Sequence, residues 1–167
     1  LVSTGARYTV DDLQWTCFTG TAEPNINIQG NSITIIDGDT TPSTADGTAF
    51  GTTIISGSDV EKTFAIQNLG SANLLLDTPA VVLLDGAQGF TVSVQPTINP
   101  MTGFTNQTFK LKFNNTVPGT YTETVMIGSN DPDTSVYAFE VKAVVIAPTI
   151  TVDKTLLTGF TYPFGQG

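Results

Sequence analysis

The chain contains no histidine and a single cysteine among its 167 residues. Without histidine, neither a Ser-His-Asp triad nor a Cys-His pair can form, and zinc lacks its favoured ligand. The single cysteine, Cys17, excludes a disulfide within the chain, so packing must stabilise the fold. Cys17 lies on the apolar face of an alternating segment, where a small buried side chain is expected rather than a nucleophile. We therefore predict that this chain is not an enzyme.

Positive charge is scarce. Six lysines and arginines stand against fifteen aspartates and glutamates, which gives a net charge of −9 and a pI near 4.1. No basic stripe can neutralise phosphates, so nucleic acid is not an expected partner, and anionic membranes are disfavoured. Threonine, serine, asparagine and glycine fill the surface positions that charged residues take in a typical cytoplasmic protein. We therefore predict an extracellular or cell-surface location. Because an exported protein without disulfides is typical of bacteria, we also predict a bacterial source.

Long apolar runs are also missing. No segment reaches the roughly 18 consecutive apolar residues that span a bilayer, so we expect no membrane span. The start at Leu1 carries neither methionine nor a charged-then-apolar signal peptide. We expect a piece of a longer protein whose export signal lies elsewhere.

β-branched residues are abundant and strong helix formers are sparse, which predicts an all-β protein. Turn signals recur about every eight to twelve residues, the spacing of an antiparallel β-sandwich rather than of βαβ units. The expected strands are 25–29, 32–36, 50–55, 60–67, 74–76, 81–84, 90–95, 108–113, 120–128 and 136–146.

Alternation along these strands places one apolar row toward the space between two sheets. The predicted core is Phe64, Ile66, Phe90, Val92, Phe109, Leu111, Phe113, Tyr121, Val125, Ile127, Phe139 and Val141.

The turn signals divide the chain into three parts. Residues 1–22 hold one long alternating strand and a linker, residues 23–147 hold the sandwich, and residues 148–167 restart a strand pattern at Pro148. A single strand is not stable alone, so each end segment must pair with a neighbouring domain or lie along the sandwich.

Three aspartates in one polar loop form the strongest candidate metal site. Asp37 and Asp39 flank a glycine, and Asp46 follows in the same loop. Carboxylates at this spacing could surround a calcium ion. The loop lacks the glycine and glutamate continuation of an EF-hand, however, and Asx-turns explain aspartate beside glycine equally well. Both interpretations stay open, and no other cofactor is expected.

Other carboxylates favour structural roles. Asp131 and Asp133 lie in an Asn-Asp-Pro-Asp stretch, which is ordinary turn chemistry, although calcium is again an alternative. Asp11 and Asp12 are adjacent, so on a flat strand they point to opposite faces and cannot flank one glycosidic bond. A turn, bulge or edge role is expected for this pair.

Aromatic side chains could bind sugar rings if they are exposed. The candidates are Trp15, Tyr137, Tyr162 and Phe164; the alternative for each is packing against a neighbouring strand or module.

Five stretches carry a resemblance to a known family: 25–30, 36–42, 46–51, 63–68 and 129–133. They resemble the immunoglobulin-like modules of the choice-of-anchor D group, which are similar to the ASPM, SPD-2 and hydin family and occur in large surface proteins of Bacteroidetes. The resemblance covers about three quarters of the chain, residues 23–147, and implies an immunoglobulin-like antiparallel β-sandwich that serves as a non-catalytic module of a multidomain protein.

The two end segments resemble pieces of other modules. Residues 10–15 resemble the closing strand of a jelly-roll domain, and residues 159–162 resemble the opening strand of a repeated module. The resemblance therefore implies a middle segment of an exported protein, commonly a substrate of type IX secretion. Residues 39–41 resemble the O-glycosylation signal of exported Bacteroidetes proteins, which makes Thr40 the expected glycosylation site.

Three functions remain as hypotheses. The first is a structural or adhesive module that contacts neighbouring domains, surface glycans or other surface proteins. The second is a carbohydrate-binding accessory module of a secreted hydrolase, and exposed aromatics on one sheet would favour it. The third is a filament subunit that assembles by strand addition. No ligand-binding residue is singled out.

Overall fold

The structure, a computed structural model, describes residues 20–55, 59–86 and 88–150. Its regular elements there are nine β-strands, with no helix among the described residues, and so none that could span a membrane. The strands are β1 (Ile26–Gly30), β2 (Ile33–Ile35), β3 (Ala49–Ile54), β4 (Val60–Asn68), β5 (Leu76–Leu83), β6 (Phe90–Val94), β7 (Asn106–Phe113), β8 (Gly119–Ser129) and β9 (Val136–Ile146).

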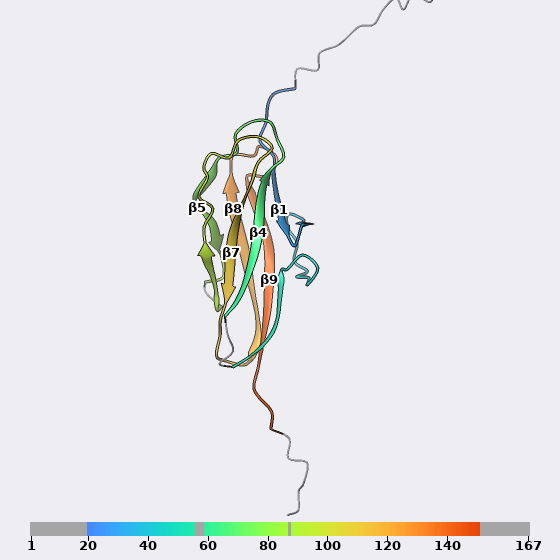
Figure 1. Cartoon of the computed structure of the whole chain (residues 1–167), viewed down its shortest axis with the longest axis vertical. Coiled ribbons are helices and arrows are strands. Elements are labelled where there is room, and N and C mark those ends of the chain that lie inside the picture. Colours follow the sequence, from blue (N-terminus) through green and yellow to red (C-terminus); the bar gives the residue numbers. More distant parts are fainter. Residues whose placement is uncertain (1–19, 56–58, 87, 151–167) are drawn as a thin grey trace, which may run out of the picture.

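The strands form the two layers of a β-sandwich, elongated along the strand direction (Figure 1). One sheet has the order β2-β1-β4-β7-β6 and the other the order β3-β9-β8-β5. Alternating buried and exposed residues along β4, β7, β8 and β9 put one side of each sheet against the other. The all-β, immunoglobulin-like sandwich is therefore confirmed.

One strand pair departs from the antiparallel prediction. β3 runs parallel to β9, with Thr52 opposite Val144 and Ile54 opposite Ile146. The chain leaves the five-stranded sheet after β2 and crosses to the edge of the other sheet, where it first touches β9 through an Asp39–Phe139 bridge. Because it travels on in the same direction as β9, the strand formed there must be parallel.

The two short apolar runs predicted at 74–76 and 81–84 are also different. A single strand, β5, contains the last residue of the first run and most of the second, and its register with β8 shifts between Leu76 and Val81. The shifted part contains Pro79, which has no N–H to donate to a ladder. Leu74 lies outside β5 and forms an isolated bridge with Met101.

The core is aromatic at its centre. Phe64 of β4 stacks on Phe109 of β7, with ring centroids 5.4 Å apart, and meets Phe139 of the opposite sheet at 5.8 Å. Burial of each such side chain contributes about 1.5–3 kcal/mol. The predicted core row is confirmed, except that Val92 and Tyr121 are only partly buried. Leu74, Met101 and Tyr137 are core members that lie outside the predicted row.

Candidate functional site

The three aspartates proposed for calcium each bind a different part of the backbone. Asp37 Oδ1 accepts a hydrogen bond from Ala138 N of β9 at 2.8 Å. Asp39 Oδ1 accepts from Thr41 N at 2.8 Å and Thr41 Oγ1 at 2.6 Å. Asp46 is buried, and its Oδ1 accepts hydrogen bonds from both Thr48 N and Thr48 Oγ1.

Asp39 and Asp46 therefore form the Asx-turns that the sequence offered as the alternative to calcium binding. In the part of the chain that the structure describes, no group of three or more aspartate, glutamate, cysteine or histidine side chains could hold a metal ion. The structure does not bring the three predicted carboxylates together, and calcium binding at this loop stays a prediction. What the loop does in the fold is to lie along β9, where Gly38 N donates to Ala138 O and Asp39 O accepts from Glu140 N.

Asp131, in the turn between β8 and β9, is a buried link between the two sheets. Its Oδ1 accepts from Asp133 N at 2.9 Å and Thr134 N at 3.2 Å, as an Asx-type turn requires. Its Oδ2 accepts from Ile26 N, the first residue of β1, at 2.8 Å. The side chain is 4% exposed, whereas that of Asp133 is exposed. The turn role was predicted; the bond to β1 was not.

Asn68 plays a matching part at the same end. It is buried at the end of β4, and its Oδ1 accepts from Asn25 N at 3.2 Å and Gly70 N at 3.1 Å. Its Nδ2 donates to Ala72 O at 2.7 Å. The contact with Asn25 joins positions 43 apart in the sequence, so no local pattern predicts it.

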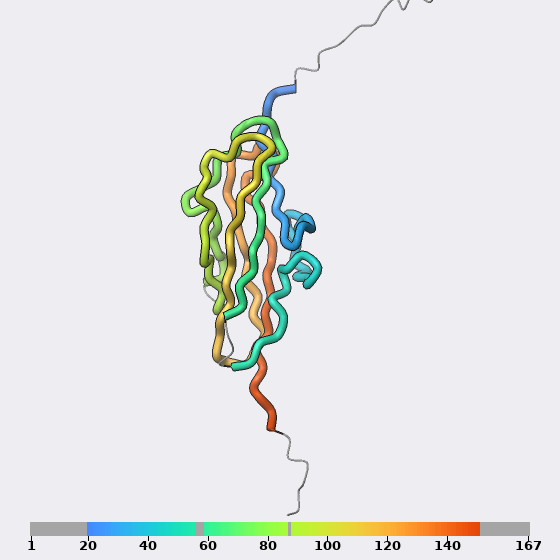
Figure 2. The backbone as a smooth tube through the Cα atoms, viewed as in Figure 1, coloured from blue at the N-terminus to red at the C-terminus, as the bar shows by residue number. Residues whose placement is uncertain are grey.

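The chain enters and leaves the sandwich at opposite ends (Figures 1 and 2). The bond from Ile26 to Asp131 places the start of β1 beside the β8–β9 turn. From that turn β9 runs for eleven residues, about 35 Å, to the far end, where the chain leaves. The points at which the chain enters and leaves the sandwich are therefore separated by the length of its long axis.

Two side-chain amides cover the free edge of β5. Gln95 accepts from Val81 N at 3.0 Å and donates to Val81 O at 2.7 Å. Asn99 does the same with the N and O of Leu76, at 3.0 and 2.7 Å. Each amide supplies the donor and acceptor that a neighbouring strand would supply, so these edge groups are unavailable to another chain. The depression between the two amides, about 270 Å³, is smaller than an ordinary ligand pocket.

The aromatic side chains of the described sheets face inward. Tyr137, a predicted sugar-binding candidate, is buried and donates its hydroxyl hydrogen to Ile35 O, so that candidate is wrong. Tyr121 donates to Val117 O at 2.8 Å, the tyrosine corner that is typical of immunoglobulin-like folds. Trp15, Tyr162 and Phe164 lie outside the described residues, as do Asp11, Asp12 and Cys17.

One exposed aromatic was missed by the sequence reasoning. Phe104 lies in the loop before β7, is 77% exposed, and has a backbone φ of 59°. That conformation is unusual for a bulky residue. Its N–H donates to Gly70 O, so it sits at the end where the chain enters. No periodic signal marks it, because it belongs to no strand.

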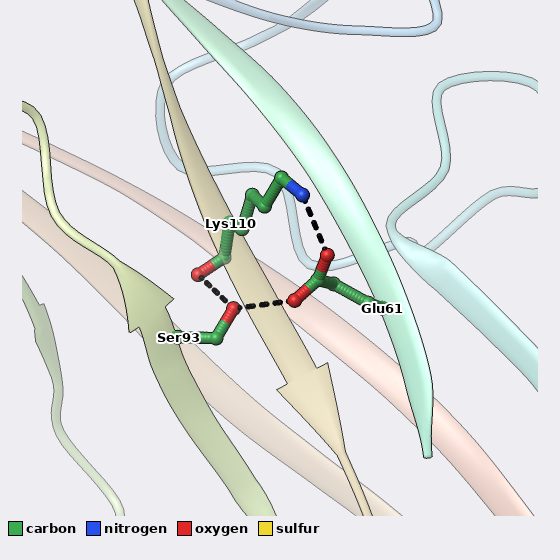
Figure 3. Close-up of polar contacts among 3 residues, drawn as sticks. All are labelled: Glu61, Ser93 and Lys110. Atoms are coloured by element: carbon green, nitrogen blue, oxygen red, sulfur yellow. Dashed lines mark hydrogen bonds and ion pairs between the residues drawn. The ribbon is translucent and has the colours of Figure 1, made fainter. Parts of the chain in front are cut away.

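Polar residues cover the outer face of the five-stranded sheet. Glu61 Oε1 pairs with Lys110 Nζ at 2.7 Å, and Ser93 Oγ donates to Glu61 Oε2 at 3.0 Å. Figure 3 shows the three side chains together on this face. The Lys110 ammonium, followed by the Ser93 hydroxyl, lowers the pKa of Glu61 below its ordinary value. Both side chains of this pair are exposed to solvent, and exposed ion pairs add little to stability. Thr40, the predicted glycosylation site, is likewise exposed.

No protein-family model and no curated protein matches the chain. Among solved structures, a protein of unknown function from Porphyromonas gingivalis is similar, with a TM-score of 0.54 and 14% identity over 78% of this chain and 50% of that one. This chain thus spans about half the length of that protein. A PapD-like domain of human CEP192 is more distant, with a TM-score of 0.45 and 13% identity over 86% of this chain and all of that domain. At such identities, the Porphyromonas likeness supports the fold alone.

Proposed function

We propose that residues 23–147 are a non-catalytic structural module of the choice-of-anchor D type, which spaces or presents neighbouring domains of a secreted or surface bacterial protein. One observation carries this proposal: the chain enters the sandwich at one end and leaves at the other, about 35 Å away. A module with this layout adds its full length to a multidomain chain. The low fraction of charged residues and the polar outer face of the five-stranded sheet fit exposure to an extracellular medium.

The observed surface supports this function over sugar binding. Stacking on sugar rings needs flat aromatic faces in solvent. In the described sheets the phenylalanines pack in the core, and the exposed aromatic Phe104 lies on a loop at one end. Threonines instead alternate along the solvent side of β8, at Thr120, Thr122 and Thr124.

Three of the four sheet edges support it over a filament built by strand addition. A donated strand needs a free row of backbone donors and acceptors. Gln95 and Asn99 occupy such groups on β5, and β2 offers just three residues. The β3 edge is interrupted by a register shift between Ala49 and Gly51.

Export by type IX secretion and O-glycosylation at Thr40 belong to the same proposal, as does adhesion to surface glycans or proteins. Thr40 is exposed beside the four-stranded sheet, where a transferase could reach its hydroxyl. Intact mass and peptide mapping would detect a glycan at this residue, and the Thr40→Ala variant should lose it.

The location is tested on cells that make the full-length protein. Antibodies against residues 23–147 should bind intact cells, and protease added outside should remove the epitope. The culture medium is examined in parallel after the cells have been removed, because a released form of the protein would carry the epitope into it. Protection of the epitope in intact cells, together with its absence from the medium, would contradict an extracellular module.

A further inference from the structure

We infer that the sandwich is built to bear tension between its two ends, and that Asp131 passes this load from the entering chain to the leaving strand. This inference rests on the spacer function proposed above. It is a separate property, however, because a spacer can hold its neighbours apart and still unfold easily when it is pulled.

The entering chain is anchored before its first strand begins. Leu69 N donates to Asn25 O at 2.7 Å, and Asn25 N donates to the buried Asn68 side chain. Ala72 N donates to Glu23 O at 3.3 Å. β1 then pairs on one side with β2 and on the other with β4. Tension along β1 is perpendicular to these antiparallel hydrogen bonds, so they are loaded in shear and must break together.

The leaving strand is held in the same way. β9 pairs with β8 along ten positions, from Gly119 opposite Val145 to Gly128 opposite Val136. Its other side is covered by β3 and by the loop at Asp39. Tension that pulls β9 out of the far end again acts along the strand, between two neighbours, rather than peeling it from an edge.

Asp131 joins these two halves of the path. One oxygen binds Ile26 N at the start of β1, and the other binds the turn that leads into β9. The carboxylate is buried, so water competes little for these bonds, and bonds to a charged acceptor are the stronger kind. Asp133, two residues later, is exposed, which makes it a matched control.

The wild-type chain tests the inference through the direction of pulling. With Cys17 replaced by serine, handles at Ala22 and Ala147 load the sandwich end to end. Handles at Pro118 and Ala147 instead pull apart the adjacent ends of β8 and β9, which separate one pair at a time. We expect end-to-end pulling to require at least about twofold more force. Equal or lower force end to end would overturn the inference.

The Asp131→Asn variant tests the linking residue. Asparagine keeps one acceptor oxygen, so it must give up either the β1 bond or the turn bonds. At fixed end-to-end force, its unfolding rate should rise about tenfold or more, and that of Asp133→Asn less than about threefold. In the Pro118 and Ala147 direction, Asp131→Asn should change the rate much less. An equal effect in both directions would mean a merely structural role and overturn the assignment.

If Asp131→Asn does not fold, the wild-type comparison of directions still decides whether the sandwich bears tension. A weak wild-type sandwich would remove the load-bearing inference alone. The spacer function is tested independently, by the location of the epitope and by the distance between the two ends.

Discussion

At the scale of single residues, the least satisfied group in the described part of the chain is the side chain of Glu123. It points into the core from β8 and is fully buried. Its Oε1 accepts from Asp85 N at 2.6 Å, but its Oε2 has no hydrogen-bond partner among the described residues. A buried carboxylate with one free oxygen is costly.

Replacing Glu123 should therefore separate charge from hydrogen bonding. Glu123→Gln keeps the acceptor for Asp85 N and removes the charge, so we expect the free energy of unfolding to rise by about 1 kcal/mol. Glu123→Ala leaves that N–H unpaired and opens a cavity, so it should fall by about 2 kcal/mol. Urea denaturation at neutral pH measures both. A glutamine variant less stable than wild type would contradict this interpretation.

Tyr137 should make the fold sensitive to alkali. Burial raises the pKa of this phenol above its ordinary value of 10.0. Below that value the phenol is protonated in both states, and its contribution is fully present. As the pH rises further, the unfolded chain loses the proton first, so the free energy of unfolding falls through the folded-state pKa.

Tyr137→Phe is the test of this alkaline effect. At neutral pH it should cost about 1 kcal/mol, because the bond to Ile35 O is lost. Between about pH 9 and 11.5 it should lose stability more slowly than wild type, as followed by urea denaturation at each pH. Parallel pH profiles of the two proteins would show that Tyr137 is not responsible.

At the scale of elements, β1 depends on a close contact with the acidic loop. A Cβ on Gly30 would collide with the backbone carbonyl of Asp46, while one on Gly119 would meet the Tyr121 side chain at 3.3 Å. Gly30→Ala should therefore lower the free energy of unfolding by about 3 kcal/mol or more, and Gly119→Ala by about 1 kcal/mol. Thermal unfolding of both variants checks this; equal losses would show that the loop yields.

The amides on the β5 edge give a second prediction at this scale. The Gln95→Ala, Asn99→Ala double variant exposes backbone donors and acceptors of Val81 and Leu76. We expect concentration-dependent self-association by light scattering, while Asn106→Ala on an exposed face should stay monomeric. A monomeric double variant would show that other features protect this edge.

The sequence predicted elements better than it predicted their partners. Alternation identified β4, β7, β8 and β9 because each has one buried face, and side-chain period is a local property. The parallel pairing of β3 depends on where the chain crosses between sheets, which no local pattern records. Asp131 was predicted to be a turn residue, but its partner Ile26 lies 105 positions away. Such long-range satisfaction of buried polar groups is decided by the assembled fold.

At the scale of the whole molecule, the proposed function depends on how the strands and the two chain ends are arranged. An aromatic core holds two sheets together, buried polar side chains fix the point where the chain enters, and β9 carries the chain to the far end. The candidate calcium loop covers part of the edge of β9 through its backbone hydrogen bonds. These features together support the proposed strut between neighbouring domains.

The most direct test of this strut is the distance between its ends in solution. Spin labels at Asn25→Cys and Ile146→Cys, in a Cys17→Ser background, mark the two ends for pulsed electron paramagnetic resonance. A rigid strut predicts one narrow distribution centred at about 35 Å, the length of β9, apart from the reach of the labels. A broad distribution, or one centred below about 20 Å, would contradict a rigid module that keeps its neighbouring domains apart.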